Sequence, residues 1–254
     1  MQAKWKYALG LVLLAAGVLG LVLSPAQCQN NFNEREIKSQ KSSLDKADVW
    51  SLDFRFKDPR LIKVNIPARG TRICWYLWYQ VINRTAEPRQ FIPDFELVTL
   101  DHPAAYRDEV IGPAVEDAIK RIEDPTGYQD IKNSVTITKN LIPLSKAEGE
   151  AFPRAVTGVA IWDGTAADPK KRDPKVKDLS DATRFTIFIR GLSNGYVLVK
   201  PLAEGLPETT RYKTLQLNFQ RKGDRLSLDS REISFVPPSE WIYRPARRSE
   251  EKDK

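Results

Sequence analysis

The sequence has few of the residues that build disulfide scaffolds and metal centres. Its 254 residues include two cysteines, Cys28 and Cys74, and one histidine, His102. At most one disulfide can form, so the fold must rely on a hydrophobic core for its stability. Zinc sites take three or four ligands, and His102 beside Asp101 does not supply them. We therefore expect neither a metal centre nor a cofactor.

Motifs of nucleotide-binding and redox enzymes are also missing: there is no P-loop, dinucleotide fingerprint or CxxC pair. Residues 191–195, "GLSNG", match the G-x-S-x-G nucleophile elbow. That elbow leads into a helix, whereas the β-rich segment "YVLVKP" follows here, and His102 precedes Ser193 although α/β-hydrolases place the histidine after the serine. We interpret "GLSNG" as a turn and predict no catalytic residues. Nucleic acid is not an expected partner, because no basic stripe with interleaved aromatics is present.

One uncharged apolar run, Ala8 to Leu23, follows Lys4 and Lys6 near the N-terminus. It ends at "SPA", where small residues suit a signal peptidase. As a helix the run spans about 24 Å, which is less than the roughly 30 Å hydrocarbon core of a bilayer. Residues 1–26 therefore predict a signal peptide, with an uncleaved membrane anchor as the alternative. Both place the rest of the chain outside the cytoplasm, with membrane contact only through this segment.

The mature chain divides by composition into three parts. Residues 27–46 are polar and predict a tether, residues 47–245 predict the folded domain, and residues 246–254 predict a disordered charged tail. The formal net charge is +7. A basic exported protein is attracted to anionic polymers and lipid headgroups of the cell envelope.

Alternation of apolar and polar residues predicts about nine strands and one helix in the domain. The helix begins at Pro113 and carries Val115, Ile119 and Ile122 on one face, within a helical insertion at about 101–133. Many short strands without strand–helix alternation predict a mainly β fold, an antiparallel β-sandwich, with two smaller sandwiches split near residue 130 as the alternative. The expected strands are 49–56, 60–66, 71–83, 90–100, 134–142, 155–162, 183–191, 212–220 and 225–235.

The strand at residues 71–83 contains "CWYLWYQVIN" and has two very different faces, because successive side chains of a strand point to opposite sides. One face is expected in the core between the sheets, opposite Trp50, Phe54 and Phe188. It carries Ile73, Trp75, Leu77, Tyr79 and Val81. The other carries Cys74, Tyr76, Trp78, Gln80 and Ile82.

The second face has two interpretations. Helix 113–123 can cover it with Val115, Ile119 and Ile122, or it can be an exposed platform on which Tyr76, Trp78 and Gln80 bind a sugar ring or a partner protein. Cys74 is expected to be a buried free thiol, with a disulfide to Cys28 as the alternative.

Residues 78–97, "WYQVINRTAEPRQFIPDFEL", resemble the strand-turn-strand of immunoglobulin-like accessory domains in bacterial envelope proteins. The resemblance implies an immunoglobulin-like sandwich with an adhesion, assembly or scaffolding role outside the cytoplasm, and it implies no catalytic residues. We expect an exported, non-enzymatic envelope protein whose partner is another envelope protein or a polysaccharide. The alternative is a carbohydrate-binding module or carbohydrate-active enzyme that uses Tyr76 and Trp78.

Overall fold

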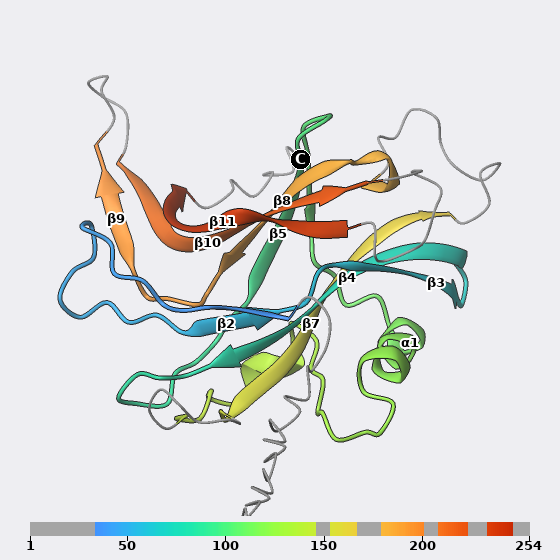
Figure 1. The fold of residues 1–254 in the computed structure, drawn as a ribbon, viewed down its shortest axis with the longest axis horizontal. Helices are drawn as coiled ribbons and strands as arrows, with labels where there is room; N and C mark the ends of the chain where they lie inside the picture. Colours follow the sequence, from blue (N-terminus) through green and yellow to red (C-terminus); the bar gives the residue numbers. More distant parts are fainter. Residues whose placement is uncertain (1–33, 146–152, 167–178, 201–207, 223–232, 246–254) are drawn as a thin grey trace, which may run out of the picture. The chain divides into compact units, whose positions relative to one another are not determined.

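Two antiparallel β-sheets and one α-helix make up the part of the chain that the computed structural model describes (Figure 1). The described residues are 34–145, 153–166, 179–200, 208–222 and 233–245. They contain eleven strands, which confirms the mainly β, antiparallel prediction. The predicted signal peptide or anchor and the predicted charged tail lie outside these residues. In the described part of the chain no helix is long and apolar enough to cross a membrane.

The first sheet is organised around one long strand. Its members are β1 (Arg35–Ile37), β2 (Asp53–Phe56), β3 (Arg60–Ile66), β4 (Gly70–Ile82) and β7 (Ala155–Ala166). Strand β7 pairs with one edge of β4. Strands β2 and β3 follow each other along the opposite edge, because β2 pairs with residues 79–82 and β3 with residues 70–76. Strand β1 pairs with β2.

The second sheet has the order β11-β10-β8-β5-β6, and β9 pairs with β10 beyond the end of β8. Its strands are β5 (Asp94–Thr99), β6 (Ala104–Arg107), β8 (Arg184–Arg190), β9 (Tyr196–Val199), β10 (Thr209–Arg221) and β11 (Ile233–Pro245). Strand β4 pairs with β7, and β5 pairs with β8. Each sheet therefore combines strands from both sides of residue 130, which is not the arrangement of two sandwiches split there.

The main core lies between the two sheets and contains the predicted face of β4, from Ile73 to Val81 at alternate positions. Across this core Trp75 meets Phe185 edge-on at 5.3 Å between ring centroids, and Tyr79 lies 4.9 Å from Phe95. Burial of these rings is the main source of stability for such a fold. Phe54 also belongs to the core, but it stacks beside Tyr79 in the same sheet rather than facing it from the other sheet.

Phe188 was expected in this core and lies instead on the outer face of the second sheet. The fully buried residues of β8 are Phe185, Ile187 and Ile189, at the alternate positions that face the core. Because four of the five residues 185–189 are apolar, hydrophobicity alone does not choose the inward face. Thr186 and Arg190, two residues to either side of Phe188, carry the signal for the outward face.

Helix α1 (Pro113–Glu123) packs against the outer face of the first sheet. Val115 and Ile119 are fully buried there, as predicted, in a second cluster with Cys74, Tyr76 and Trp78. Ile122 is 48% exposed, which corrects its prediction. The last buried residue of the helix is Glu123 instead, because its carboxylate accepts hydrogen bonds from Lys57, Arg60 and Tyr76.

One predicted strand adopts another structure, and a second lies mostly outside the described residues. Residues 134–142 were expected as a strand, but Thr136–Lys139 forms a short 3-10 helix. Asn133 favours this turn, since its side-chain oxygen accepts hydrogen bonds from the backbone N–H groups of Val135 and Thr136. The strand expected at 225–235 falls mostly outside the described residues, and the described strand β11 begins at Ile233.

Residues 34–46, the second part of the predicted tether, pack against both sheets. Arg35–Ile37 form strand β1 on the first sheet, and the carboxylate of Asp45 binds Lys213 of β10 in the second. We call residues 34–46 the arm. Its polar composition suggested solvent exposure, whereas in the structure Arg35, Glu36 and Asp45 form ion pairs with residues of the two sheets and their connections.

Candidate functional site

The residues predicted as an exposed aromatic platform are covered. Tyr76 and Trp78 are 1% and 2% exposed beneath α1 and the loop after it. The Tyr76 hydroxyl donates to Glu123 Oε1 at 2.8 Å, and Trp78 Nε1 donates to Gln129 Oε1 at 3.1 Å. The expectation of an exposed platform is therefore wrong for Tyr76 and Trp78.

Glu123 is the polar centre of the contact between helix and sheet. Besides Tyr76 it accepts Lys57 Nζ and Arg60 Nη1, each at 2.9 Å. The Lys57 ammonium also lies 4.3 Å from the centre of the Trp78 ring. Burial, together with the neighbouring Glu123 charge, raises the pKa of Tyr76 far above its ordinary value, so this hydroxyl stays protonated and donates.

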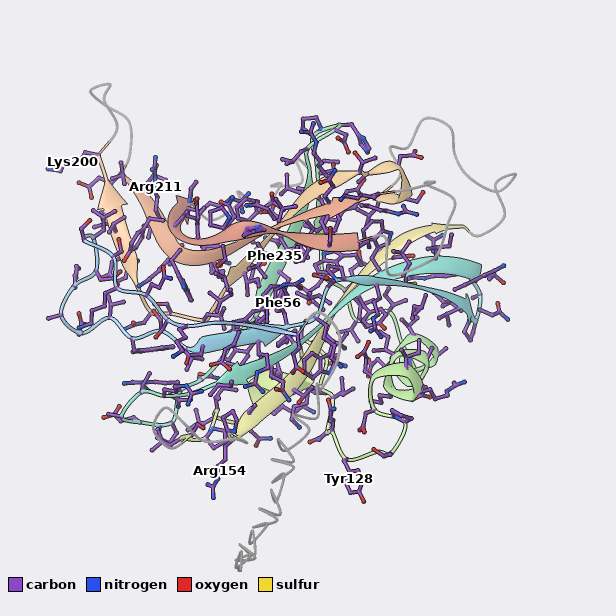
Figure 2. The ribbon with its side chains drawn as sticks, viewed as in Figure 1. Phe56, Tyr128, Arg154, Lys200, Arg211 and Phe235 are labelled. Carbon is purple, nitrogen blue, oxygen red and sulfur yellow. The ribbon has the colours of Figure 1, made fainter. Side chains whose placement is uncertain are left out.

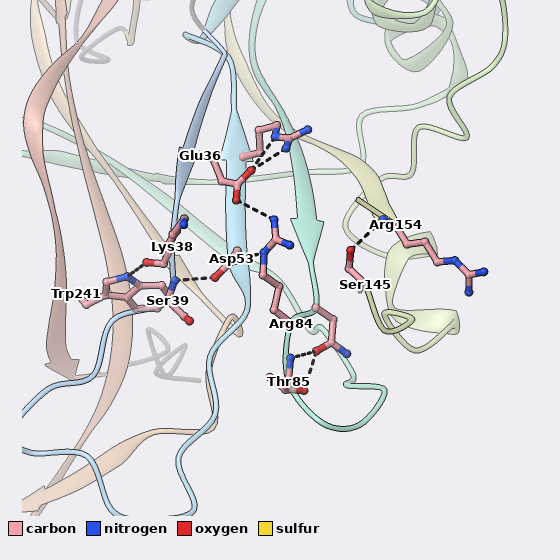
Figure 3. A network of polar contacts seen from close by, with 11 residues as sticks. Glu36, Lys38, Ser39, Asp53, Arg84, Thr85, Ser145, Arg154 and Trp241 are labelled. Carbon is pink, nitrogen blue, oxygen red and sulfur yellow. Dashed lines mark hydrogen bonds and ion pairs between the residues drawn. The ribbon is translucent and has the colours of Figure 1, made fainter. Parts of the chain in front are cut away.

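Gln80, the third predicted binding residue, lies further along β4, outside the cover of α1. Its Nε2 donates to Thr157 Oγ1 at 3.2 Å, and its Oε1 accepts from Arg55 at 3.3 Å. Arg55 also donates to Glu36, and Glu36 in turn accepts from Arg84 (Figure 3). Gln80 is therefore part of the polar contacts that attach β1 to the first sheet, and it does not form a site with Tyr76 and Trp78.

The same network shows how the arm is held (Figure 3). Asp53, which is buried, accepts Arg84 Nε at 2.8 Å and the backbone N–H of Ser39 at 2.7 Å. Burial raises the pKa of Glu36, but hydrogen bonds from Arg55 and Arg84 more than offset this and leave the pKa below its ordinary value. Glu36 is consequently ionised and attractive to both guanidinium groups at neutral pH.

The "GLSNG" segment forms a connection between two strands, β8 and β9. The Ser193 hydroxyl donates to the carbonyl of Trp50 at 2.5 Å and accepts from Ser51 and from the backbone N–H of Gly195. Gly191 has a φ of 98°, a conformation that glycine adopts without strain. All the contacts of Ser193 are structural, and strand β9 follows where an elbow needs a helix.

Asp101, considered with His102 as a metal ligand, caps the start of β8. Its Oδ2 accepts the backbone N–H groups of Thr183 and Arg184 at 2.6 and 2.9 Å. Among the described residues no group of three potential ligands from His, Cys, Asp and Glu is present. The backbone hydrogen bonds from Arg184 and Thr183 lower the pKa of Asp101 to about 2.

Asp101 predicts an acid-dependent change in stability. A carboxylate whose pKa is lowered by folding stabilises the fold above its unfolded pKa and loses this contribution as the pH falls through its folded pKa. We expect Asp101→Asn to be less stable than the wild type at neutral pH, and the difference to vanish between about pH 4 and about pH 2. Urea titrations at several pH values measure it. A difference that stays constant over this range would contradict the assignment.

Cys74 is a fully buried free thiol beneath α1. Burial, with a smaller contribution from the Asp163 charge, raises the pKa of the Cys74 thiol to about 11. A protonated thiol without solvent contact is not a nucleophile. Cys28, the alternative disulfide partner, lies outside the described residues.

The outer face of the second sheet is the surface that no described helix covers. Three rings on or beside this face each have a cation over them: Arg244 lies 4.0 Å from the Phe188 ring, Arg190 5.2 Å from Tyr212, and Lys46 4.7 Å from Tyr196. We call this surface the open face. It also exposes Leu198, which pairs across β9 and β10 with Thr210.

A small cavity of about 20 Å³ lies within the open face. Two ion pairs border it, Arg190 with Asp94 at 2.6 Å and Arg244 with Glu96. Its lining residues are Asp94, Glu96, Arg107, Phe188, Arg190, Thr214, Arg244 and Pro245.

Sequence reasoning missed this site because its residues come from five separate strands, β5, β6, β8, β10 and β11. None of them forms a motif, and Phe188 was assigned to the core. The weak signal was that arginine and aromatic residues share the outward positions of β8 and β10. The described residues thus have a two-sheet, β-sandwich-like architecture in which a helix covers the outer face of the first sheet and none covers that of the second. Comparisons with protein-family models, curated proteins and solved structures found no match.

Proposed function

We propose that the protein is an exported, non-enzymatic binding domain that holds a partner protein of the cell envelope on its open face. The observation that carries the proposal is the difference between the two outer faces. The aromatic face of the first sheet is sealed by α1, whereas that of the second sheet leaves Tyr196, Leu198 and Tyr212 exposed. Arg190 lies over the Tyr212 ring, and Lys46 lies over the Tyr196 ring. Tyrosine and arginine are enriched in protein interfaces and at their energetic hot spots.

The location and the family resemblance are part of the proposal. Residues 1–26 support export by their pattern of lysines, apolar run and small residues. The strand-turn-strand that resembles immunoglobulin-like envelope domains corresponds to the end of β4 and to β5, which lie in different sheets. A connection that crosses between sheets is compatible with an immunoglobulin-like sandwich. Binding or scaffolding outside the cytoplasm is the role that unites these features.

The proposal is tested by a photo-cross-linking residue placed on the open face of the native protein in its own cells. At Leu198, which is 59% exposed, we expect a covalent product with a protein of the envelope fraction. The matched position is Lys120, which is exposed on α1. Products at both positions with equal yield, or at neither, would contradict a binding role for the open face. Recovery of the protein from the cytosol with residues 1–26 intact would contradict export.

A further inference from the structure

The geometry points to a carboxylate-binding pocket within the open face, formed by Arg107, Arg190 and Arg244, which receives one aspartate or glutamate side chain of the partner protein. This inference rests on the proposed function and names the chemistry of the partner. It starts from the cavity between these arginines, which has a volume of about 20 Å³. A site for a single water needs roughly 10–15 Å³, so the cavity admits one small polar group but no sugar ring.

The charges around the cavity do not balance. Three guanidinium groups and two carboxylates line it. Asp94 is paired with Arg190, and Glu96 with Arg244. Among the residues that the structure describes, Arg107 has no ion-pair partner, although its backbone pairs with that of Glu96 across β5 and β6. One positive charge is left over, and it matches the single negative charge of a carboxylate.

Two of the three arginines, Arg190 and Arg244, are held in place before any ligand arrives. Arg190 is fixed by Asp94 and by the Tyr212 ring, and Arg244 by Glu96 and the Phe188 ring. A guanidinium has five N–H donors in a planar fork, and one carboxylate cannot use them all. Donors that remain are suited to a second carboxylate, and little side-chain entropy is lost on binding because the rings restrict both side chains.

The surroundings favour a protein as the source of the carboxylate. A sugar ring stacks on a free aromatic face, but here each ring already has a cation over it. Tyr212 contacts Arg190 of the pocket through its ring, and Tyr196 and Leu198 are exposed on the paired strand β9. Together they offer apolar contact of the kind that surrounds charged anchors in protein interfaces. An acidic polysaccharide is therefore an outcome of the test and not the proposed ligand.

The test is a titration of the full chain with a glutamate-rich peptide, followed through the Nε–Hε resonances of arginine in NMR spectra. We expect the resonances of Arg107, Arg190 and Arg244 to shift with this peptide and not with a glutamine-rich peptide of equal length.

Arg107→Gln is expected to weaken the apparent affinity for the glutamate-rich peptide about tenfold, the size of one charge-assisted hydrogen bond. Lys120→Gln, an equal change in net charge at an exposed site on α1, is expected to change it less than about twofold. Because Arg107 is exposed, its replacement leaves the melting temperature unchanged, which serves as the folding control.

Three results of the titration would overturn the pocket. The first is an equal effect of Arg107→Gln and Lys120→Gln, which would show attraction by net charge only. The second is tighter binding of an oligogalacturonate than of the peptide, which would assign the site to acidic polysaccharides. The third is the absence of any shift in the three arginine resonances.

If Arg107→Gln leaves the Leu198 cross-link intact, the pocket fails while the proposed function stands. If the peptide binds and no cross-link forms, the pocket stands and the proposed function fails.

Discussion

Replacement of Asp45 by alanine is expected to lower the free energy of unfolding by about 3–5 kcal/mol, as for the loss of one partner from a buried ion pair. Asp45 accepts Lys213 Nζ and the Tyr243 hydroxyl, each at 2.5 Å. The side chain of Lys213 is 1% exposed, and its remaining polar contact is the carbonyl of Gln40. The variant therefore leaves an ammonium group buried without its counter-charge. Urea denaturation followed by tryptophan fluorescence measures the change.

Asp48→Ala is the matched control for this prediction. Asp48 is an exposed aspartate three residues further along, and only its backbone carbonyl makes a described contact, to Asn194. We expect Asp48→Ala to change the free energy of unfolding by less than about 0.5 kcal/mol. Equal effects of the two variants would show that the arm is not held by the buried pair. The same comparison decides between the tether predicted for residues 27–46 and the docked arm.

The second large effect is expected for Glu123→Ala, which should lower the free energy of unfolding by about 3 kcal/mol. The Glu123 side chain is 1% exposed and binds Lys57, Arg60 and the Tyr76 hydroxyl. Lys57 and Arg60 are partly exposed and can turn to water after the substitution. Tyr76 is buried, and its hydroxyl then has no acceptor at this position, so the loss combines a missing ion-pair network with an unsatisfied donor.

Asp117→Ala is the control on the same helix, since Asp117 is exposed. A small effect is expected there. A further readout separates the sheet contact from helix propensity: in Glu123→Ala, the emission of Trp78 should move toward that of a solvated indole as the end of α1 loosens. Unchanged emission together with unchanged stability would contradict the central role given to Glu123.

The behaviour of residues 73–82 explains how much of the fold could be predicted. Two-residue periodicity is a local property of the chain, and it correctly assigned Trp75 and Tyr79 to the core between the sheets. The position of α1 was equally clear, because Pro113 at its start and the spacing of Val115 and Ile119 are local signals. Phe188 was misplaced where the apolar pattern occurs on both faces of one strand.

The candidate site could not be predicted in the same way. Arg107, Arg190 and Arg244 are separated by more than fifty residues from one another in the sequence, and only the pairing of β5, β6, β8, β10 and β11 brings them to one surface. Similarly, nothing local to Asp45 indicates Lys213, because ion pairs depend on distance in space and not in the chain.

The amino-acid pattern alone was sufficient for the strand-rich class, the two faces of β4 and the helix that carries Val115 and Ile119. Three features became apparent only from the folded chain: which outer face is covered by a helix, the contact of residues 34–46 with both sheets, and the meeting of the three arginines on one surface. The physical reason is that side-chain alternation follows from backbone geometry within a few residues. Coverage and charge pairing depend instead on contacts between distant segments, which many sequences with the same alternation would make differently.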